Sequence, residues 1–248
     1  MNEFIDTAIA GLLQQHQLDS FDALRSLQLK AVDEPNTERG GWSSVAKLTL
    51  GEQSFYLKRQ INHLTRSLQR PLGEPTFARE MRNIQRYQQL GIPALRAAYF
   101  AQRKVAGEQH AILLTYALTG WQDLDDWQQQ WLELSSEQQQ GIIQACAKLA
   151  RTLHSAGQMH GCFYPKHIFL QKQTTGFTAQ LIDLEKTRPL LLGQRDRIKD
   201  LEPLFRRSRH VWGRAQIQLF LQSYLDQPAD IPRWLERLES RRKNKASR

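Results

Sequence analysis

The chain has 248 residues, 40% of them hydrophobic and 24% charged, with a formal net charge of +9 at pH 7. This length suits one large domain or two lobes, and the composition is that of a globular protein. No run is apolar enough for a transmembrane helix and the N-terminus does not resemble a signal peptide. Two isolated cysteines do not form a disulfide framework or a zinc site, so we expect a cytoplasmic protein.

The first part of the chain predicts helix followed by sheet. Apolar residues recur at helical spacing within residues 1–34. Two strand-like runs, 43–50 and 53–60, flank Gly51 and Glu52, which is typical of a hairpin.

A helix and a further strand follow. Thr76 is a candidate N-cap for a helix that ends at Gly91. Residues 109–118 then resemble a strand, and we expect a hinge near residues 115–121.

The second part of the chain is mainly helical in pattern. Residues 124–157 indicate two helices with a cap at Ser135 or Ser136 between them. Short strands are expected at 168–171 and 179–185, and helix is expected again over 196–248. These patterns predict an N-terminal unit with helices and a β-rich lobe (1–117), a helical lobe (118–239) and a disordered basic tail (240–248).

The basic tail accounts for much of the charge. The last nine residues carry five Lys/Arg and no Asp/Glu. Such a tail could contact nucleic acid or anionic lipid headgroups, or be a solvated end without a partner.

Four features that could carry chemistry occur in a fixed order. Gly40 and Gly41 precede a strand, where small residues let backbone N–H groups approach phosphates. Lys58 lies on the second strand and Glu80 on the following helix, so that the lysine could meet phosphates and the glutamate could hold it. Taken singly, each has a simpler interpretation: a turn, an exposed lysine and a solvated helix face.

The fourth feature is a histidine and an aspartate on either side of a predicted hairpin. His167 and Asp183 lie sixteen residues apart and could reach one divalent cation. A carboxylate within an apolar run is costly unless it has a partner, and a metal ion is a suitable one. The alternative is a structural Asp183 with a protein partner.

Two motifs point to a family. Residues 160–170, HGCFYPKHIFL, have the pattern H-x-x-x-Y-x-x-H-h-h-L, where h is an apolar residue, and LIDL follows at 181–184. With the preceding features, this resembles the lipopolysaccharide kinases of the Kdo/WaaP type, and among them the InaA-like members, over residues 38–220. The resemblance implies an α+β, bilobal protein-kinase-like fold, with a small antiparallel sheet and a helix in the N-lobe and a mainly helical C-lobe. It also implies ATP and Mg²⁺.

The resemblance assigns roles in nucleotide binding. It implies that Lys58 grips the α- and β-phosphates and that Glu80 is its partner. The backbone of residues 115–117, which includes Tyr116 and Ala117, is implied to hold adenine. Gly40 and Gly41 are expected beside the phosphates.

It also assigns roles in the catalytic loop. His160 opens that loop and Tyr164 lies within it. His167 and Asp183 are implied to bind the metal, and Asp200 is implied to tie down the loop backbone.

Cys162 departs from the family pattern, because it stands where kinases have the aspartate that accepts the acceptor's proton. An ordinary thiol is mostly protonated at neutral pH and has no fixed charge. Lys166, Tyr164 or Glu185 could substitute, although Lys166 could instead stabilise the charge of the transferred phosphoryl group. Gly161 replaces the usual arginine, which argues against control by loop phosphorylation.

Three functions therefore stay open at this point. The first is an ATP-dependent phosphotransferase acting on a sugar hydroxyl of the lipopolysaccharide inner core (heptose or Kdo) or a similar glycan, with peripheral contact of the basic tail with the inner membrane. The second is a nucleotide-binding pseudokinase with a regulatory role. The third, a nucleic-acid-binding protein, is disfavoured because the tryptophans are not interleaved with Lys and Arg; no nucleic acid is expected as a partner.

Overall fold

The computed structural model describes residues 3–32, 34–37, 40–67 and 70–246. By its internal contacts the chain divides into two compact units, 1–86 with 95–119 and 87–94 with 120–248. No helix within the described ranges is both long and apolar enough to cross a bilayer.

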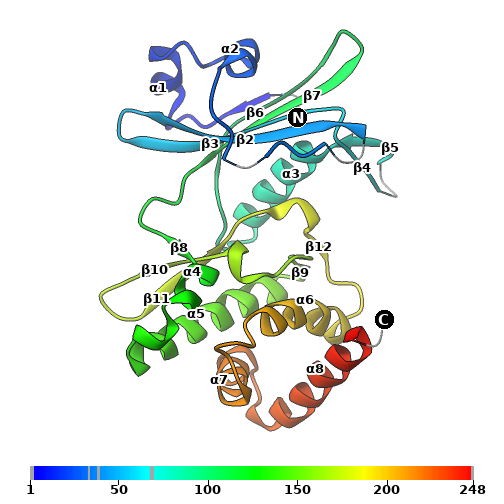
Figure 1. The fold of residues 1–248 in the computed structure, drawn as a ribbon. Helices are drawn as coiled ribbons and strands as arrows, with labels where there is room; N and C mark the ends of the chain where they lie inside the picture. Colours follow the sequence, from blue (N-terminus) through cyan, green and yellow to red (C-terminus); the bar gives the residue numbers. More distant parts are fainter. Residues whose placement is uncertain (1–2, 33, 38–39, 68–69, 247–248) are drawn as a thin grey trace. The chain divides into compact units, whose positions relative to one another are not determined.

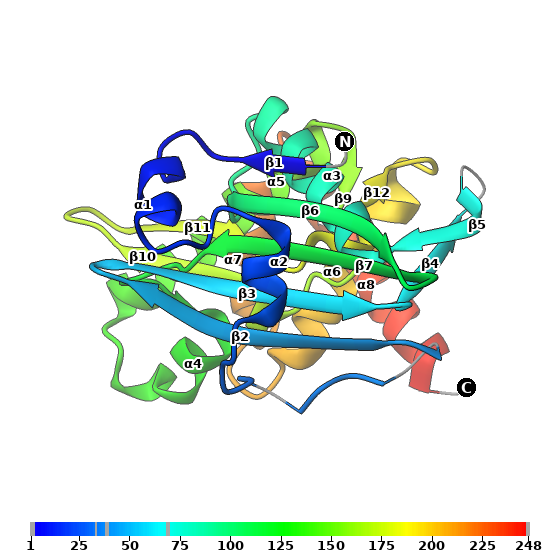
Figure 2. The ribbon, with the colours of Figure 1, turned by 90° about the horizontal axis from the view of Figure 1, so that it is seen from above.

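A five-stranded sheet forms the centre of the first unit, and every neighbouring pair in it is antiparallel (Figure 2). Its strands, in spatial order, are β1 (Glu3–Ile5), β6 (Ala97–Val105), β7 (Glu108–Tyr116), β3 (Gln53–Ile61) and β2 (Trp42–Leu50). A separate hairpin consists of β4 (Leu64–Ser67) and β5 (Arg70–Pro75).

The predicted hairpin is confirmed. Strands β2 and β3 pair in continuous register from Trp42 opposite Ile61 to Leu50 opposite Gln53. Gly51 in the connecting turn has φ +58°, a conformation that glycine adopts without strain. Strand β6 was not predicted, because its first five residues are all buried and show no alternation.

Helices cover both faces of this sheet (Figure 1). Two short helices, α1 (Ala10–Gln15) and α2 (Phe21–Ser26), lie on one face, and their buried side chains join those of the strands in one core. Helix α3 (Thr76–Gln89) lies on the other face. The prediction that residues 1–34 are helical is wrong for Glu3–Ile5, because these residues add strand β1 to β6, a pairing with residues 99–101 that local sequence does not reveal.

The start of α3 differs from the predicted N-cap. The Thr76 hydroxyl donates to the His63 carbonyl oxygen at 2.9 Å, and Oε1 of Gln60 accepts the Phe77 N–H at 2.8 Å. The end of β3 and the residues after it therefore hold the helix start. The predicted end is confirmed, since Gly91 follows the helix with φ +65°.

The second unit is mainly helical, and α5 packs against α7 while α6 packs against α8 (Figure 1). Ser135 forms the predicted cap as a capping box with Gln138. The α-helices are α4 (Leu124–Gln129), α5 (Ser136–Ser155), α6 (Gln194–Arg207), α7 (Arg214–Tyr224) and α8 (Ile231–Ala246). Short 3-10 helices are η2 (Trp131–Glu133), η3 (Pro165–His167), η4 (Leu184–Lys186) and η5 (Pro228–Asp230).

Short strands complete the second unit. The predicted hairpin is present as β10 (Ile168–Lys172) and β11 (Phe177–Leu181), although the strand ends before Asp183. The remaining strands are β8 (Gln122–Asp123), β9 (Gln158–Met159) and β12 (Arg188–Pro189).

The basic C-terminal segment is helical where a disordered tail was expected. Helix α8 continues through residues 240–246, and residues 247–248 lie outside the described ranges. Trp234, Leu235 and Leu238 are buried and anchor the helix. Arginine and lysine are good helix formers, so a helix anchored in this way extends through the basic residues.

Candidate active site

Lys58 and Glu80 form an ion pair inside the first unit. Nζ of Lys58 lies 2.6 Å from Oε1 of Glu80, and the side chains are 16% and 2% exposed. Lys58 is held on β3 between Val45 of β2 and Leu113 of β7. The two simpler interpretations, an exposed Lys58 and a solvated Glu80, are therefore wrong, and the predicted ion pair is present. Burying two charges has a desolvation cost that can exceed the attraction between them, so the pair is not explained by stability alone. This favours a functional reason for it.

The two glycines before β2 differ in what they require. A Cβ atom at Gly41 would lie 2.3 Å from the backbone nitrogen of His63, so only glycine fits there. Gly40 has φ +70° and open space around it. The need for glycine at residue 41 thus comes from the protein's own backbone, and contact with phosphates stays a prediction for both.

The segment expected to bind adenine is partly occupied by the sheet. The N–H of Tyr116 donates to the carbonyl oxygen of Arg96 at 3.0 Å, and the N–H of Ala117 donates to the carbonyl oxygen of Ser54 at 2.9 Å. The Tyr116 hydroxyl donates to Asp6, and burial raises the pKa of Tyr116 to about 12. The expectation is corrected in one respect: these two N–H groups already have partners, so N–H donors to adenine would have to come from residues after Ala117.

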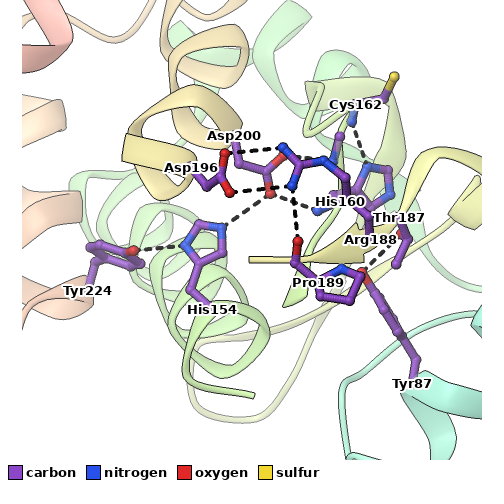
Figure 3. Close-up of polar contacts among 11 residues, drawn as sticks. Tyr87, His154, His160, Cys162, Thr187, Arg188, Pro189, Asp196, Asp200 and Tyr224 are labelled. Carbon is purple, nitrogen blue, oxygen red and sulfur yellow. Dashed lines mark hydrogen bonds and ion pairs between the residues drawn. The ribbon is translucent and has the colours of Figure 1, made fainter. Parts of the chain in front are cut away.

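Asp200 of α6 anchors the loop that begins at His160 (Figure 3). Its Oδ2 accepts the N–H of His160 and its Oδ1 accepts the N–H of Gly161, both at 2.7 Å. This is the role that the family resemblance implied for Asp200. Charge-assisted bonds of this kind are the strong ones, so the loop backbone is fixed to the helix.

A buried relay supports Asp200 from behind. Nε2 of His154 lies 3.2 Å from Oδ2 of Asp200, and Nδ1 of the same ring lies 2.7 Å from the Tyr224 hydroxyl (Figure 3). Because the carboxylate only accepts, Nε2 carries the proton and Nδ1 accepts from the tyrosine. Burial raises the pKa of Tyr224, which keeps its hydroxyl a donor.

His160 positions the loop and does not face a substrate. Its ring Nδ1 accepts the N–H of Cys162 at 3.3 Å, and Nε2 donates to the carbonyl oxygen of Ile182 at 2.9 Å. The residue has no exposed surface. We therefore correct its expected place among the catalytic residues: it connects the loop to the residue before Asp183.

Gly161 is a glycine for steric reasons. Its φ is +80°, and a Cβ atom would lie 2.6 Å from the carbonyl oxygen of Lys186. An arginine, as in most kinases, would not fit this backbone.

Cys162 and its neighbours form the centre of the loop. Cys162 is 5% exposed, and its carbonyl oxygen accepts the N–H of Tyr164 at 2.7 Å. Burial, followed by the nearby Cys162 thiol, raises the pKa of Tyr164. Lys166 is exposed on η3. Tyr164 thus stays protonated beside the thiol and is a poor substitute base.

His167 and Asp183 are brought together as predicted. Nε2 of His167 lies 3.3 Å from Oδ2 of Asp183, while Nδ1 lies 2.9 Å from the carbonyl oxygen of Cys162. Burial lowers the pKa of His167 to about 4, although Asp183 opposes the shift. The ring is therefore neutral at pH 7, Nδ1 donates to the carbonyl, and the Nε2 lone pair faces a carboxylate.

Two acceptors that face each other are stabilised by a cation between them, which can be a proton or a metal ion. A histidine that donates its other N–H to a backbone carbonyl is the usual arrangement of a metal ligand. Among the residues that the structure describes, no group of three potential side-chain ligands occurs. Phosphate oxygens and water would thus complete the coordination, as they usually do for Mg²⁺. His167 and Asp183 fit a nucleotide-bound divalent cation.

Asp183 itself is held in an uncommon backbone conformation. It has φ 58° and ψ 64°, in the left-handed region that non-glycine residues seldom adopt. Its side chain is 42% exposed. Backbone strain of this kind is common at functional sites. Here the conformation orients the Asp183 carboxylate toward His167.

The segment after Asp183 is pinned to α6 as well. Arg188 makes two hydrogen bonds to Asp196, at 3.1 and 3.3 Å (Figure 3). The N–H groups of Leu191 and Leu192 donate to the same carboxylate. The hydrogen bonds from Arg188 hold the pKa of Asp196 well below its usual range. This segment is therefore fixed without phosphorylation.

The sequence interpretation missed several residues of this site. His154 and Tyr224 form the relay behind Asp200, and the Arg207 guanidinium stacks over the Tyr164 ring at 4.2 Å from its centroid. A signal did exist for Arg207. It follows Asp200 by seven residues, which is two helical turns, so both lie on the same face of α6.

These features together define the class of protein. The first unit has a buried Lys–Glu pair, and the second has an anchored loop with a His–Asp pair. Together these are nucleotide- and metal-binding features of the α+β protein-kinase-like fold. Residues 22–224 match the model of the "Lipopolysaccharide kinase (Kdo/WaaP) family". The chain belongs to this family, which supports a kinase-type phosphotransferase acting on a sugar.

Two similar proteins bear on the assignment. "Protein InaA" of Escherichia coli (strain K12) is 32% identical over 159 residues, which cover 63% of this chain and 73% of that protein. A solved structure, "WaaP in complex with acyl carrier protein", superposes with a TM-score of 0.73 at 22% identity and covers 98% of this chain and 99% of its own. At this identity the second comparison shows the fold alone. Acyl carrier protein was not among the partners expected from the sequence.

Proposed function

We propose that the protein is an ATP-dependent phosphotransferase that phosphorylates a sugar hydroxyl of the lipopolysaccharide inner core, heptose or Kdo, or of a similar glycan. Membership of the Kdo/WaaP family supports a sugar kinase. One observation in the structure carries the proposal furthest: Nε2 of His167 and Oδ2 of Asp183 lie 3.3 Å apart, and burial lowers the pKa of His167, which favours a neutral ring. That geometry suits a divalent cation held by both side chains.

In this function, each residue would hold or position a group. His167 and Asp183 would hold the cation, which supplies Lewis-acid stabilisation of the phosphate charge when it is bound. Lys58, kept in place by Glu80, would contact the same triphosphate, so the function requires that the two units bring these residues to one nucleotide. Asp200 and His160 would fix the loop that carries Cys162.

The basic end of α8 and the acceptor belong to the same proposal. Membrane-bound inner-core sugars lie beside anionic headgroups, which would attract Arg241, Arg242 and the basic residues after them. The cytoplasmic face of the inner membrane is therefore the proposed location.

The test separates nucleotide binding from transfer. The melting temperature is measured with ATP, with and without Mg²⁺ or Mn²⁺, in the wild type and in Asp183→Ala. We expect a rise with metal and ATP that is lost in the variant, and transfer of labelled phosphate to inner-core sugars. A wild type with no response to metal and ATP would contradict the proposal.

Cys162 favours a second candidate, a nucleotide-binding pseudokinase with a regulatory role. The thiol supplies no carboxylate at the place of the catalytic base, while the groups for metal and nucleotide remain. General-base catalysis is worth about 10²–10⁴-fold, so a kinase without it is slow and not necessarily inert. Binding of ATP and metal, with no transfer to any acceptor until Cys162→Asp is introduced, would favour this candidate.

A further inference from the structure

Three positive side chains surround the loop that contains Cys162, and we call them the cationic cluster: Lys166, Lys186 and Arg207. Lys166 lies in the loop itself, and the Cβ atom of Lys186 is 3.2 Å from the position that a Cβ at Gly161 would take. Arg207 stacks over the ring of Tyr164 at 4.2 Å. All three belong to the same compact unit.

Among the residues that the structure describes, no carboxylate forms an ion pair with the cluster. Within the described part of the chain, none of its three members forms an ion pair, and all three are exposed. Neighbouring arginines differ in this respect, because Arg206 pairs with Glu202 and Arg188 pairs with Asp196. Of the acidic groups nearest in sequence, Asp183 faces His167.

Arg207 is held in place, unlike an ordinary surface arginine. Stacking on Tyr164 restrains the plane of the Arg207 guanidinium and leaves its N–H groups available to an anion. The positive charges of Arg207 and Lys186 both lower the pKa of Tyr164, against the larger effect of burial, so both charges reach the surroundings of Cys162.

We propose that the acceptor is an anionic sugar whose own carboxylate or phosphate group binds the cationic cluster and takes the proton from the attacking hydroxyl, the task for which Cys162 offers no carboxylate. This inference rests on the proposed function and names its class of substrate. Arg207 would bind the anion with its paired N–H groups, and the two lysines would add charge.

The proposed step balances. The acceptor's hydroxyl oxygen forms a bond to the γ-phosphorus, and the bond from that phosphorus to the bridging oxygen breaks, leaving its electron pair on ADP. The hydroxyl proton moves to the acceptor's carboxylate or phosphate oxygen and from there to water. Phosphoryl transfer has a loose transition state in which the proton leaves late, so a weak base is sufficient.

The experiment compares charged acceptors with neutral ones of the same shape. The four acceptors are a sugar acid, its carboxamide, a sugar phosphate and the parent neutral sugar. They are tested with the wild type, Cys162→Asp, Arg207→Gln and a control, Arg209→Gln, which removes another exposed arginine two residues away. Binding is measured by calorimetry without nucleotide, and transfer is measured with labelled ATP.

We expect the wild type to bind and phosphorylate an anionic acceptor. Transfer to the neutral counterpart of that acceptor should be slower by about 10²-fold or more. Whether the acid or the phosphate is preferred identifies the anion. Arg207→Gln should weaken binding of that anion about tenfold, the loss of one or two charge-assisted bonds, while Arg209→Gln leaves it unchanged. Cys162→Asp should raise transfer to the neutral sugar by about 10²–10⁴-fold and change the anionic one little.

Other results would overturn the inference. It fails if the wild type phosphorylates neutral and anionic acceptors equally, if neither anion binds, or if Cys162→Asp accelerates all acceptors by the same factor. Failure of the proposed function has a different signature: anions bind to the cationic cluster, yet neither the wild type nor Cys162→Asp transfers phosphate to any acceptor.

Discussion

Nε2 of His167 lies 3.3 Å from Oδ2 of Asp183, and Nδ1 of the same ring lies 2.9 Å from the Cys162 carbonyl oxygen, so in the neutral ring the proton belongs on Nδ1 and Nε2 is an acceptor. Two electron-rich atoms in this position repel each other unless a cation is present. The arrangement depends on burial, which keeps His167 neutral. It is therefore the part of the molecule whose behaviour with metal should be the most informative.

The first prediction concerns this pair. His167→Ala and Asp183→Ala should each abolish the extra stabilisation by ATP that depends on Mn²⁺ or Mg²⁺, which amounts to about 2.7 kcal/mol at a ligand concentration of 100 times Kd. Imidazole suits transition metals better than Mg²⁺, so Mn²⁺ should stabilise more than Mg²⁺, and His167→Asn should reduce that difference. Melting temperatures report the result, with His16→Ala, an exposed histidine, as control.

The second prediction is a pH dependence. The pKa of His167 is about 4 in the folded protein and about 6.5 in an unfolded chain, so only the unfolded chain binds a proton here between these values. The free energy of unfolding should therefore fall by about 3 kcal/mol as the pH decreases from 6.5 to 4. His167→Asn lacks this loss, and its stability relative to the wild type should rise on acidification. Urea unfolding with a chelator measures it, and a constant difference between the two proteins would contradict the assignment.

The third prediction separates stability from nucleotide binding at Lys58 and Glu80. Lys58→Met leaves a buried carboxylate without its partner and should destabilise the protein by about 3–5 kcal/mol. The double variant Lys58→Met with Glu80→Leu should recover most of that stability but not the affinity for ATP. Urea unfolding and nucleotide titration measure the two effects. Lys47→Met, an exposed lysine on the neighbouring strand, serves as control.

The order of these residues in the chain predicted much of the site. Lys58 with Glu80, and His167 with Asp183, were paired from the sequence, and both pairs are in contact. The hairpin of β2 and β3 carried a local signal in its alternation and its glycine turn. Patterns of this kind are short-range, so the sequence displays them directly.

What the sequence did not predict depends on contacts between distant segments. Strand β1 forms by pairing with β6, and β6 is buried on both faces and so lacks alternation. His160 is a positioning residue because Cys162 and Ile182 occupy both of its ring nitrogens. Gly41 is needed by the backbone at His63. Apart from Cys162, two residues after His160, these partners lie about twenty or more residues away in the sequence.

The fourth prediction concerns the anchor of the loop. Asp200→Asn exchanges one acceptor oxygen for a donor that faces an N–H group or His154, and should destabilise the protein by about 3 kcal/mol. Tyr224→Phe removes only the hydrogen bond at the far end of the relay and should cost about 1 kcal/mol. If transfer activity is present, Asp200→Asn should lower kcat more than Tyr224→Phe does. Equal losses of stability in both variants would show that the loop does not depend on Asp200.

The fifth prediction uses two glycines of similar backbone conformation as a matched pair. Gly157 has φ +70° and no atom within 4 Å of the position that a Cβ would take, whereas Gly161 has φ +80° and its Cβ would lie 2.6 Å from the Lys186 carbonyl oxygen. Gly157→Ala should therefore destabilise by only the left-handed strain, about 1–2 kcal/mol. Gly161→Ala should cost clearly more and should displace Lys186, lowering affinity for an anionic acceptor. Thermal unfolding and acceptor titration measure both, and equal effects of the two alanines would mean that the loop moves away from Lys186 without loss.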